Sequence, residues 1–184
     1  MNMEELIVSV QEWSKNKGLD KADSRGQFLK VVEEAAEISE ALEKRNWYVG
    51  ESYSEYAQEE TQDAIGDTYV TLIILAQQHN IDFIELWKNA KGVEVNVSVK
   101  SVVARVNSIL IELGKIAGSL ARGKDESDKV VQYSIFRLIP TLDALSKENG
   151  LTSKECLEMA YNVISKRKGQ MVDGVFVKEE DLIK

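Results

Sequence analysis

The amino-acid sequence repeats hydrophobic residues at the spacing of an α-helix along most of its length. In the first half, this periodicity predicts four helices, over residues 3–16, 24–45, 54–78 and 82–90. Ser24 and Asp82 stand where the second and fourth of these helices begin, and both residue types are common N-caps. Residues 46–53, which include Trp47, are expected to form the loop between the second and third helices.

The second half of the chain follows the same plan. Its periodicity predicts three further helices, over residues 101–120, 126–147 and 152–166. Thr152 is the expected N-cap of the last helix, and Pro140 is expected to kink or break the middle one. Residues 92–99 alternate apolar and polar side chains like a strand, and we interpret them as a linker. A single Pro and 11 Gly in 184 residues also favour an all-α fold.

The two halves resemble each other, which suggests a tandem duplication. Residues 34–42 align with 112–120 and residues 67–75 align with 137–145, with a shorter loop in the second copy. The two copies would pack as a pseudo-dimer: residues 1–92 as a first repeat and residues 93–184 as a degenerate second repeat, in one compact unit. Chance helical periodicity is the alternative explanation of the same resemblance.

Acidic residues are concentrated in the first half. The formal net charge of −8 argues against binding to nucleic-acid polymers, whose phosphates require a basic surface. Residues 1–92 contain 18 Asp and Glu against 9 Lys and Arg, whereas residues 93–184 contain 13 against 14. The proposed alignment accounts for part of this difference, because it places Glu34, Glu37, Asp63 and Asp67 opposite Glu112, Lys115, Tyr133 and Arg137.

The carboxylates of the first half form two stripes at helical spacing. One helix carries Glu33, Glu34, Glu37 and Glu40, and the next carries Glu60, Asp63 and Asp67. Like charges at these spacings repel each other, and a divalent cation shared by both stripes would remove the conflict. Small residues beside the acids, such as Ala64 and Gly66, would let the two helices approach closely. The alternative is that these acids only line the solvent side of amphipathic helices.

Two motifs in these stripes resemble a known superfamily. Residues 32–37 and 60–63 resemble the E-x-x-E and E-x-x-D signature of the all-α nucleotide pyrophosphohydrolases, which include MazG, the dimeric dUTPases and phosphoribosyl-ATP pyrophosphohydrolase. Residues 63–72 are similar to the helix that follows in MazG-like proteins, and residues 160–177 are similar to the end of phage-type MazG relatives. The resemblance implies a four-helix-bundle-type fold for the chain.

The resemblance also implies a reaction and a set of metal ligands. Family members cleave a nucleoside triphosphate between the α and β phosphates, with Mg²⁺ as the cation and Mn²⁺ as an alternative. The implied ligands are Glu34, Glu37, Glu60 and Asp63, with Glu33 as a further ligand or as the base that orients water. In many MazG-like sequences the key Asp directly follows Gly, which selects Asp67 instead, so all three residues of the second stripe are retained as candidates.

Basic and aromatic residues supply candidate substrate contacts. By resemblance, Asn162, Lys166 and Arg167 grip substrate phosphates, although basic residues at a helix end also complement the helix dipole. Lys30 precedes the acidic stripe by one turn and Gln27 by two, and both are further candidates. Trp13 and Trp47 could stack on a base or simply pack at the edge of the core.

The leading hypothesis is therefore an Mg²⁺-dependent (d)NTP pyrophosphohydrolase. A phosphoribosyl-ATP pyrophosphohydrolase and a non-catalytic helical module that binds nucleotide or metal are the alternatives. No apolar run approaches the length of a membrane span, so we expect a soluble, cytoplasmic protein that binds a nucleotide and has no membrane partner, with a homodimer as a further option. The single Cys156 is expected to be a buried structural thiol.

Overall fold

The computed structural model describes residues 1–47, 51–93, 102–123, 127–172, 175–179 and 182. These residues form seven α-helices, one 3-10 helix and one β-hairpin, which confirms the all-α class apart from the hairpin. The elements in chain order are α1 (Met3–Asn16), η1 (Leu19–Lys21), α2 (Ser24–Trp47), α3 (Glu51–Gln78), α4 (Phe83–Ala90), α5 (Val102–Arg122), α6 (Ser127–Glu148), α7 (Ser153–Ile164), β1 (Gly169–Val172) and β2 (Val175–Lys178). Among the described residues, no helix is long and apolar enough to cross a lipid bilayer.

Side-chain caps start several of the helices where the sequence predicts them. The side chain of Asp82 accepts a hydrogen bond from the backbone N–H of Glu85, and Thr152 and Glu155 form a capping box at the start of α7. The prediction for Ser24 is wrong by one residue. Ser24 is already helical, and Asp23 accepts the hydrogen bond from the backbone N–H of Arg25 instead.

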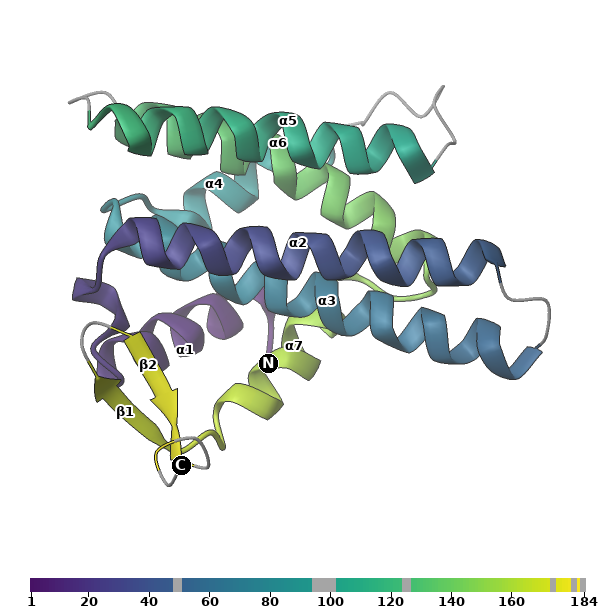
Figure 1. Ribbon diagram of the computed structural model, residues 1–184, viewed down its shortest axis with the longest axis horizontal. Helices are drawn as coiled ribbons and strands as arrows, with labels where there is room; N and C mark the ends of the chain where they lie inside the picture. Colours follow the sequence, from purple (N-terminus) through teal and green to yellow (C-terminus); the bar gives the residue numbers. More distant parts are fainter. Residues whose placement is uncertain (48–50, 94–101, 124–126, 173–174, 180–181, 183–184) are drawn as a thin grey trace.

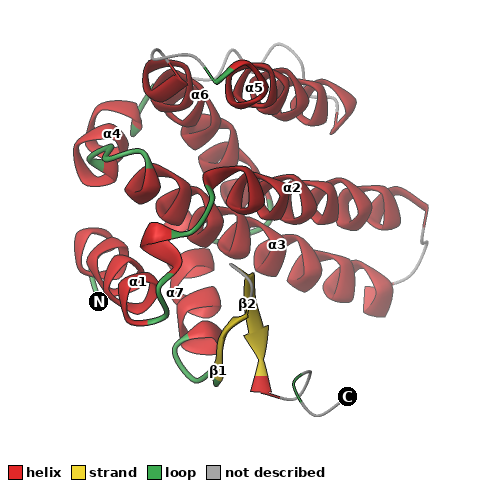
Figure 2. Cartoon of the chain, turned by 60° about the vertical axis from the view of Figure 1, so that its left-hand side comes forward, coloured by secondary structure: helices red, strands yellow, loops and turns green. Residues whose placement is uncertain are grey.

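The long antiparallel helices α2 and α3 form the centre of the molecule. Helices α5 and α6 pack together on one side of this pair, and α1 and α7 lie on the other side (Figures 1 and 2). Residues of both halves of the chain share one hydrophobic core, which includes Leu6, Ile38, Leu72, Ile135 and Leu157. The second half therefore does not form a core of its own.

The second half departs from its predictions at two places. Helix α6 continues through Pro140 to Glu148, so the helix does not break at this residue, and a kink there stays a prediction. The last helix ends at Ile164, and the chain then forms a two-stranded antiparallel hairpin that sequence reasoning missed, with Gln170 opposite Val177 and Met171 opposite Phe176. The predicted linker over residues 92–99 lies mostly outside the described residues.

Gly66 permits close packing between α3 and α7. A Cβ at this position would overlap the carbonyl oxygen of Cys156 and lie 3.0 Å from the Cβ of Ala160. The sequence pattern assigned this glycine to the approach of α2 and α3, so the expectation is corrected: the small residue serves the α3–α7 contact. Cys156 is fully buried there, and burial raises the pKa of its thiol, as befits a structural cysteine.

Candidate functional site

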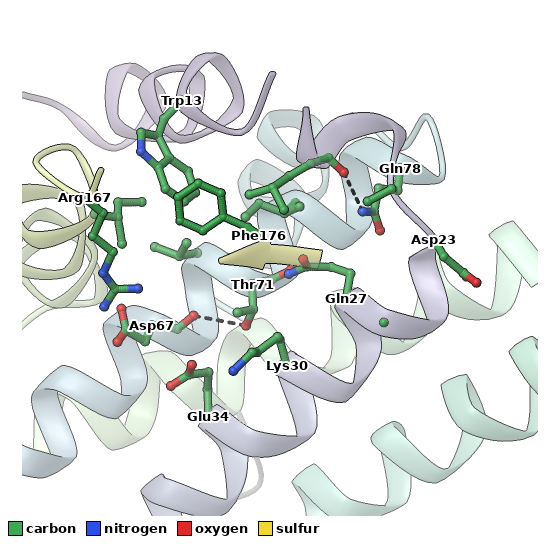
Figure 3. Close-up of a pocket in the computed structure, with 16 residues that line it drawn as sticks. Trp13, Asp23, Gln27, Lys30, Glu34, Asp67, Thr71, Gln78, Arg167 and Phe176 are labelled. Carbon is green, nitrogen blue, oxygen red and sulfur yellow. Dashed lines mark hydrogen bonds between the residues drawn. The ribbon is translucent and has the colours of Figure 1, made fainter. Parts of the chain in front are cut away.

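A pocket of about 250 Å³ opens between α1, η1, α2, α3, α7 and β2 (Figure 3). Its apolar wall consists of Trp13, Leu19, Val70, Ile74, Ile164 and Phe176. Its polar lining includes Asp23, Gln27, Lys30, Glu34, Asp67, Thr71, Gln78 and Arg167. Residues from both ends of the chain therefore complete a pocket that is built on the α2–α3 pair.

Two carboxylates from neighbouring helices lie at this pocket. Glu34 projects from the middle of α2 and Asp67 from α3, and their side chains lie near each other in the close-up (Figure 3). Burial, followed by the negative charges of Asp67, Glu37 and Glu33, raises the pKa of Glu34 to about 7. The molecule thus holds a half-buried carboxyl group among like charges, an arrangement that is costly without a cation.

Two cations complement the carboxylates. The Lys30 Nζ lies 2.6 Å from the Glu33 Oε2, one turn before Glu34, and its charge lowers the pKa of Glu34 without offsetting the increase. Arg167, just beyond the end of α7, lines the same pocket and points its guanidinium group towards Asp67 (Figure 3). Asn162 and Lys166, the other predicted phosphate contacts, are exposed and are not among the lining residues.

The structure separates the second acidic stripe into two groups. Asp67 lines the pocket, whereas Glu60 lies two turns away, with its Oε2 3.2 Å from the Nζ of Lys44. Asp63 is exposed and does not line the pocket. Of the two alternatives left open by the sequence, the structure brings Asp67 to Glu34, and it places Glu60 against an ion-pair partner elsewhere along the same hairpin.

The carboxylates around Glu34 have the chemistry of a site for a hard divalent cation. Mg²⁺ and Mn²⁺ prefer oxygen ligands, and the carboxylates of Glu34 and Asp67 present oxygen atoms at the pocket. Glu37 is exposed one turn beyond Glu34, close enough for its charge to raise the pKa of Glu34. Within the described parts of the chain, no three Asp, Glu, His or Cys side chains come together in a group that could hold a metal ion.

The pocket contains residues that the sequence pattern did not select. The amide of Gln78 donates from Nε2 to the carbonyl oxygen of Leu19 at 2.7 Å, and Gln27, which was selected, donates to that of Thr71 at 3.0 Å. Phe176 of β2 meets Trp13 edge to face, with ring centroids 6.1 Å apart. The dipeptide Asp-Gly at 173–174, between apolar residues, is a hairpin signal that could have revealed this part of the wall. The side chain of Trp47 lies outside the described residues.

Comparisons with known proteins leave the family open. No protein-family description matches the chain, and no solved structure is significantly similar to it. The chain is 28% identical over 82 residues to the uncharacterized 18.2 kDa protein in the rep-hol intergenic region of Haemophilus phage HP1. The match covers 44% of this chain and 44% of the phage protein, so the two are similar over less than half of their lengths.

Proposed function

We propose that this protein is a nucleotide pyrophosphohydrolase that uses Mg²⁺, or Mn²⁺ in its place, to convert a (d)NTP into a (d)NMP and pyrophosphate. The observation that carries the proposal is the pair of carboxylates at the pocket, Glu34 from α2 and Asp67 from α3, in surroundings that raise the pKa of Glu34 to about 7. The motif resemblance of residues 32–37 agrees with it.

In this proposal Glu34, Asp67 and Glu37 hold the cation. Glu37 stands three residues after Glu34, and a change of rotamer would bring its carboxylate to the same point, because residues three apart are neighbours on a helix surface. The bound cation would neutralise phosphate charge and lower the pKa of the attacking water. Glu33, whose Oε2 lies 2.6 Å from the Nζ of Lys30, would accept the proton from that water.

The other residues that line the pocket would bind different parts of the substrate. Lys30 and Arg167 lie on the carboxylate side of the pocket and would bind phosphate oxygens, to which Arg can present two parallel donors. The apolar wall with Trp13 and Phe176 would bind the base, because aromatic side chains offer a large apolar surface for stacking. The amides of Gln27 and Gln78 lie beside that wall and would contact the polar edge of the base.

A panel of canonical and damaged nucleotides, assayed with Mg²⁺ for released pyrophosphate, tests the proposal. We expect turnover that falls at least about 100-fold in Glu34→Gln and in Asp67→Asn, since a ligand substitution should cost no less than a change in the surroundings of a metal. Glu60→Gln is the matched control, because Glu60 is bound to Lys44 outside the pocket. This variant should keep nearly full activity.

Three results would count against the proposal in different ways. Turnover that survives in both Glu34→Gln and Asp67→Asn would place the chemistry elsewhere. Tight nucleotide binding without any pyrophosphate release would favour the non-catalytic binding module. Turnover of phosphoribosyl-ATP alone would favour that narrower enzyme, which shares the same metal scaffold.

A further inference from the structure

A second cluster of charged residues lies on the α5–α6 pair. The Nζ of Lys115 lies 2.8 Å from the Oε1 of Glu112, and the Nε of Arg137 lies 4.0 Å from the same oxygen. The ammonium group of Lys115 also lies 5.9 Å from the ring centroid of Tyr133. One turn of α5 and one turn of α6 thus meet around a single carboxylate.

These four residues are the ones that the internal sequence alignment predicts to correspond to the acidic site. Glu112 aligns with Glu34, Lys115 with Glu37, Tyr133 with Asp63 and Arg137 with Asp67. The alignment depends on sequence alone, yet the structure gathers all four second-half residues on one helix pair. Glu112 and Arg137 lie opposite each other across α5 and α6, as Glu34 and Asp67 do across α2 and α3.

Charge distinguishes the two clusters. The carboxylates around Glu34 outnumber Lys30 and Arg167, the basic side chains at the pocket, and in the proposed function a cation from solution compensates for the excess. In the second, Glu112 is buried, with 8% of its side chain exposed, and its Oε2 has no hydrogen-bond partner in the described structure. Removing a carboxylate from water is costly unless an opposite charge compensates for it. Lys115 and Arg137 supply that charge, at two positions where the first copy has acids.

We propose that the α5–α6 pair is a second copy of the α2–α3 pair in which Lys115 and Arg137 take the place of the bound cation, so that each chain has one metal–nucleotide site. The two basic side chains stabilise the fold around Glu112, and the second copy binds no metal. The replacement of a bound cation rests on the metal site of the proposed function, whereas the compensation of Glu112 by Lys115 and Arg137 does not.

A stability cycle tests the role of the two cations directly. Lys115→Met combined with Arg137→Met should lower the Tm, because it leaves the charge of Glu112 without compensation. Adding Glu112→Gln should recover most of that loss. Mg²⁺ should shift the Tm of this triple variant by as much as it shifts that of the wild-type protein, because both keep the first site and the second copy binds no metal. If the two Met substitutions lowered the Tm equally in the protein with Glu112 and in the protein with Glu112→Gln, the basic side chains would not interact with Glu112. This result would overturn the proposal.

A gain-of-binding experiment tests the common origin of the two sites. The starting protein carries Glu34→Gln and Asp67→Asn, which remove the first site. Adding Lys115→Glu and Arg137→Asp gives a quadruple variant that should bind one Mn²⁺ per chain, measured by the loss of the free-ion signal in electron paramagnetic resonance. Circular dichroism confirms that each variant is folded.

The outcomes separate this proposal from the proposed function. A folded quadruple variant that binds no Mn²⁺ overturns the duplication of the metal site, even if the wild-type protein hydrolyses nucleotides. A wild-type protein without turnover, together with Mn²⁺ binding in the quadruple variant, overturns the enzymatic proposal and supports the duplication. If the quadruple variant does not fold, the stability cycle decides the role of Lys115 and Arg137 alone.

Discussion

Glu34 carries the carboxyl group at the pocket whose ionised form is disfavoured by burial and by neighbouring negative charges. Its carboxyl group is half-buried, Asp67 faces it from α3, and Glu33 and Glu37 flank it on α2. Lys30 is the cation that acts on it, and its effect is the smallest of these contributions. A group whose charged form is disfavoured in this way destabilises the folded state whenever it ionises.

Substitution of Glu34 is therefore expected to change how stability depends on pH. The pKa of Glu34 is about 7 in the folded state against 4.5 ordinarily, so the folded protein holds more protons in this window. Its contribution to stability is full below pH 4.5 and is lost as the pH rises to about 7. Glu34→Gln should raise the Tm at about pH 8 by a few degrees, roughly 2–4 °C for each kcal/mol, and by much less at about pH 4.5.

Thermal unfolding measured by circular dichroism at both pH values checks this expectation. Glu59→Gln is the control, because Glu59 is exposed on the same helix as Asp67 and does not line the pocket. If Glu34→Gln changed the Tm by the same amount at both pH values, ionisation of Glu34 would not be the cause of the change.

At the scale of elements, the α3–α7 contact depends on a residue without a side chain. The carbonyl of Cys156 occupies the space that a Cβ at position 66 would need, and a backbone carbonyl in a helix cannot rotate away. This contact brings the end of α7 towards the pocket, where Arg167 lies near Asp67 (Figure 3). Gly66 therefore affects the pocket indirectly, because it sets the position of α7 and of Arg167 beyond the end of that helix.

Gly66→Ala should lower the free energy of unfolding by about 1–3 kcal/mol, as overpacking of a closed interface does. Gly114→Ala is the matched control, because a Cβ at this exposed position in α5 meets nothing within 4 Å. This control should stabilise the protein by roughly 0.5–1 kcal/mol, since glycine is a poor helix former. Urea denaturation measures both values, and a neutral Gly66→Ala would show that α7 shifts freely on α3.

The hairpin places one aromatic side chain at the pocket. Phe176 contacts Trp13 of α1, and the Nζ of Lys17 lies 5.5 Å from the centroid of its ring. Phe176→Ala should raise the KM for nucleotides several-fold with little change in kcat, because the apolar wall binds ground state and transition state alike. Phe176→Leu should retain most of the binding, and a fall in kcat without a change in KM would assign the residue another role.

At the scale of the whole molecule, a buried polar junction joins the two halves. Tyr69 of α3 donates to the Oδ1 of Asp143 in α6 at 2.9 Å, and Ser153 of α7 donates to the same oxygen. The ends of α3 and α6 are also tied, because Gln58 and Gln62 both donate to the carbonyl oxygen of Asn149. Because of these bonds and the shared core, we expect the two halves to unfold as one cooperative unit.

Tyr69→Phe should lower the free energy of unfolding by about 1–3 kcal/mol, because it removes a hydrogen bond between the buried Tyr69 and the half-buried Asp143. Unfolding should remain a single transition when followed by both tryptophan fluorescence and circular dichroism. Tyr56→Phe, at an exposed position in α3, should change stability by less than about 0.5 kcal/mol. Two separate transitions in the wild-type protein would contradict a common core.

The helices and most of their boundaries could be predicted from the amino-acid sequence alone. Hydrophobic periodicity and N-caps depend only on residues that are near one another in the sequence. Asp82 and Thr152 could therefore be recognised as the N-caps of α4 and α7. The same local information identified Glu34 and Asp67 as candidates, together with Glu60 and Asp63. The internal alignment also matched Glu112, Lys115 and Arg137 with Glu34, Glu37 and Asp67.

Which of these groups come into contact depends on how the helices pack in three dimensions. Glu60 and Asp67 share a helix face but lie about 10 Å apart along the axis, and the register of α2 against α3 sets Asp67 beside Glu34 and Glu60 beside Lys44. Phe176, Gln78 and Arg167 enter the pocket from distant parts of the chain. Their meeting depends on how helices pack against one another, and a periodicity read along one helix contains no information about the distance to another.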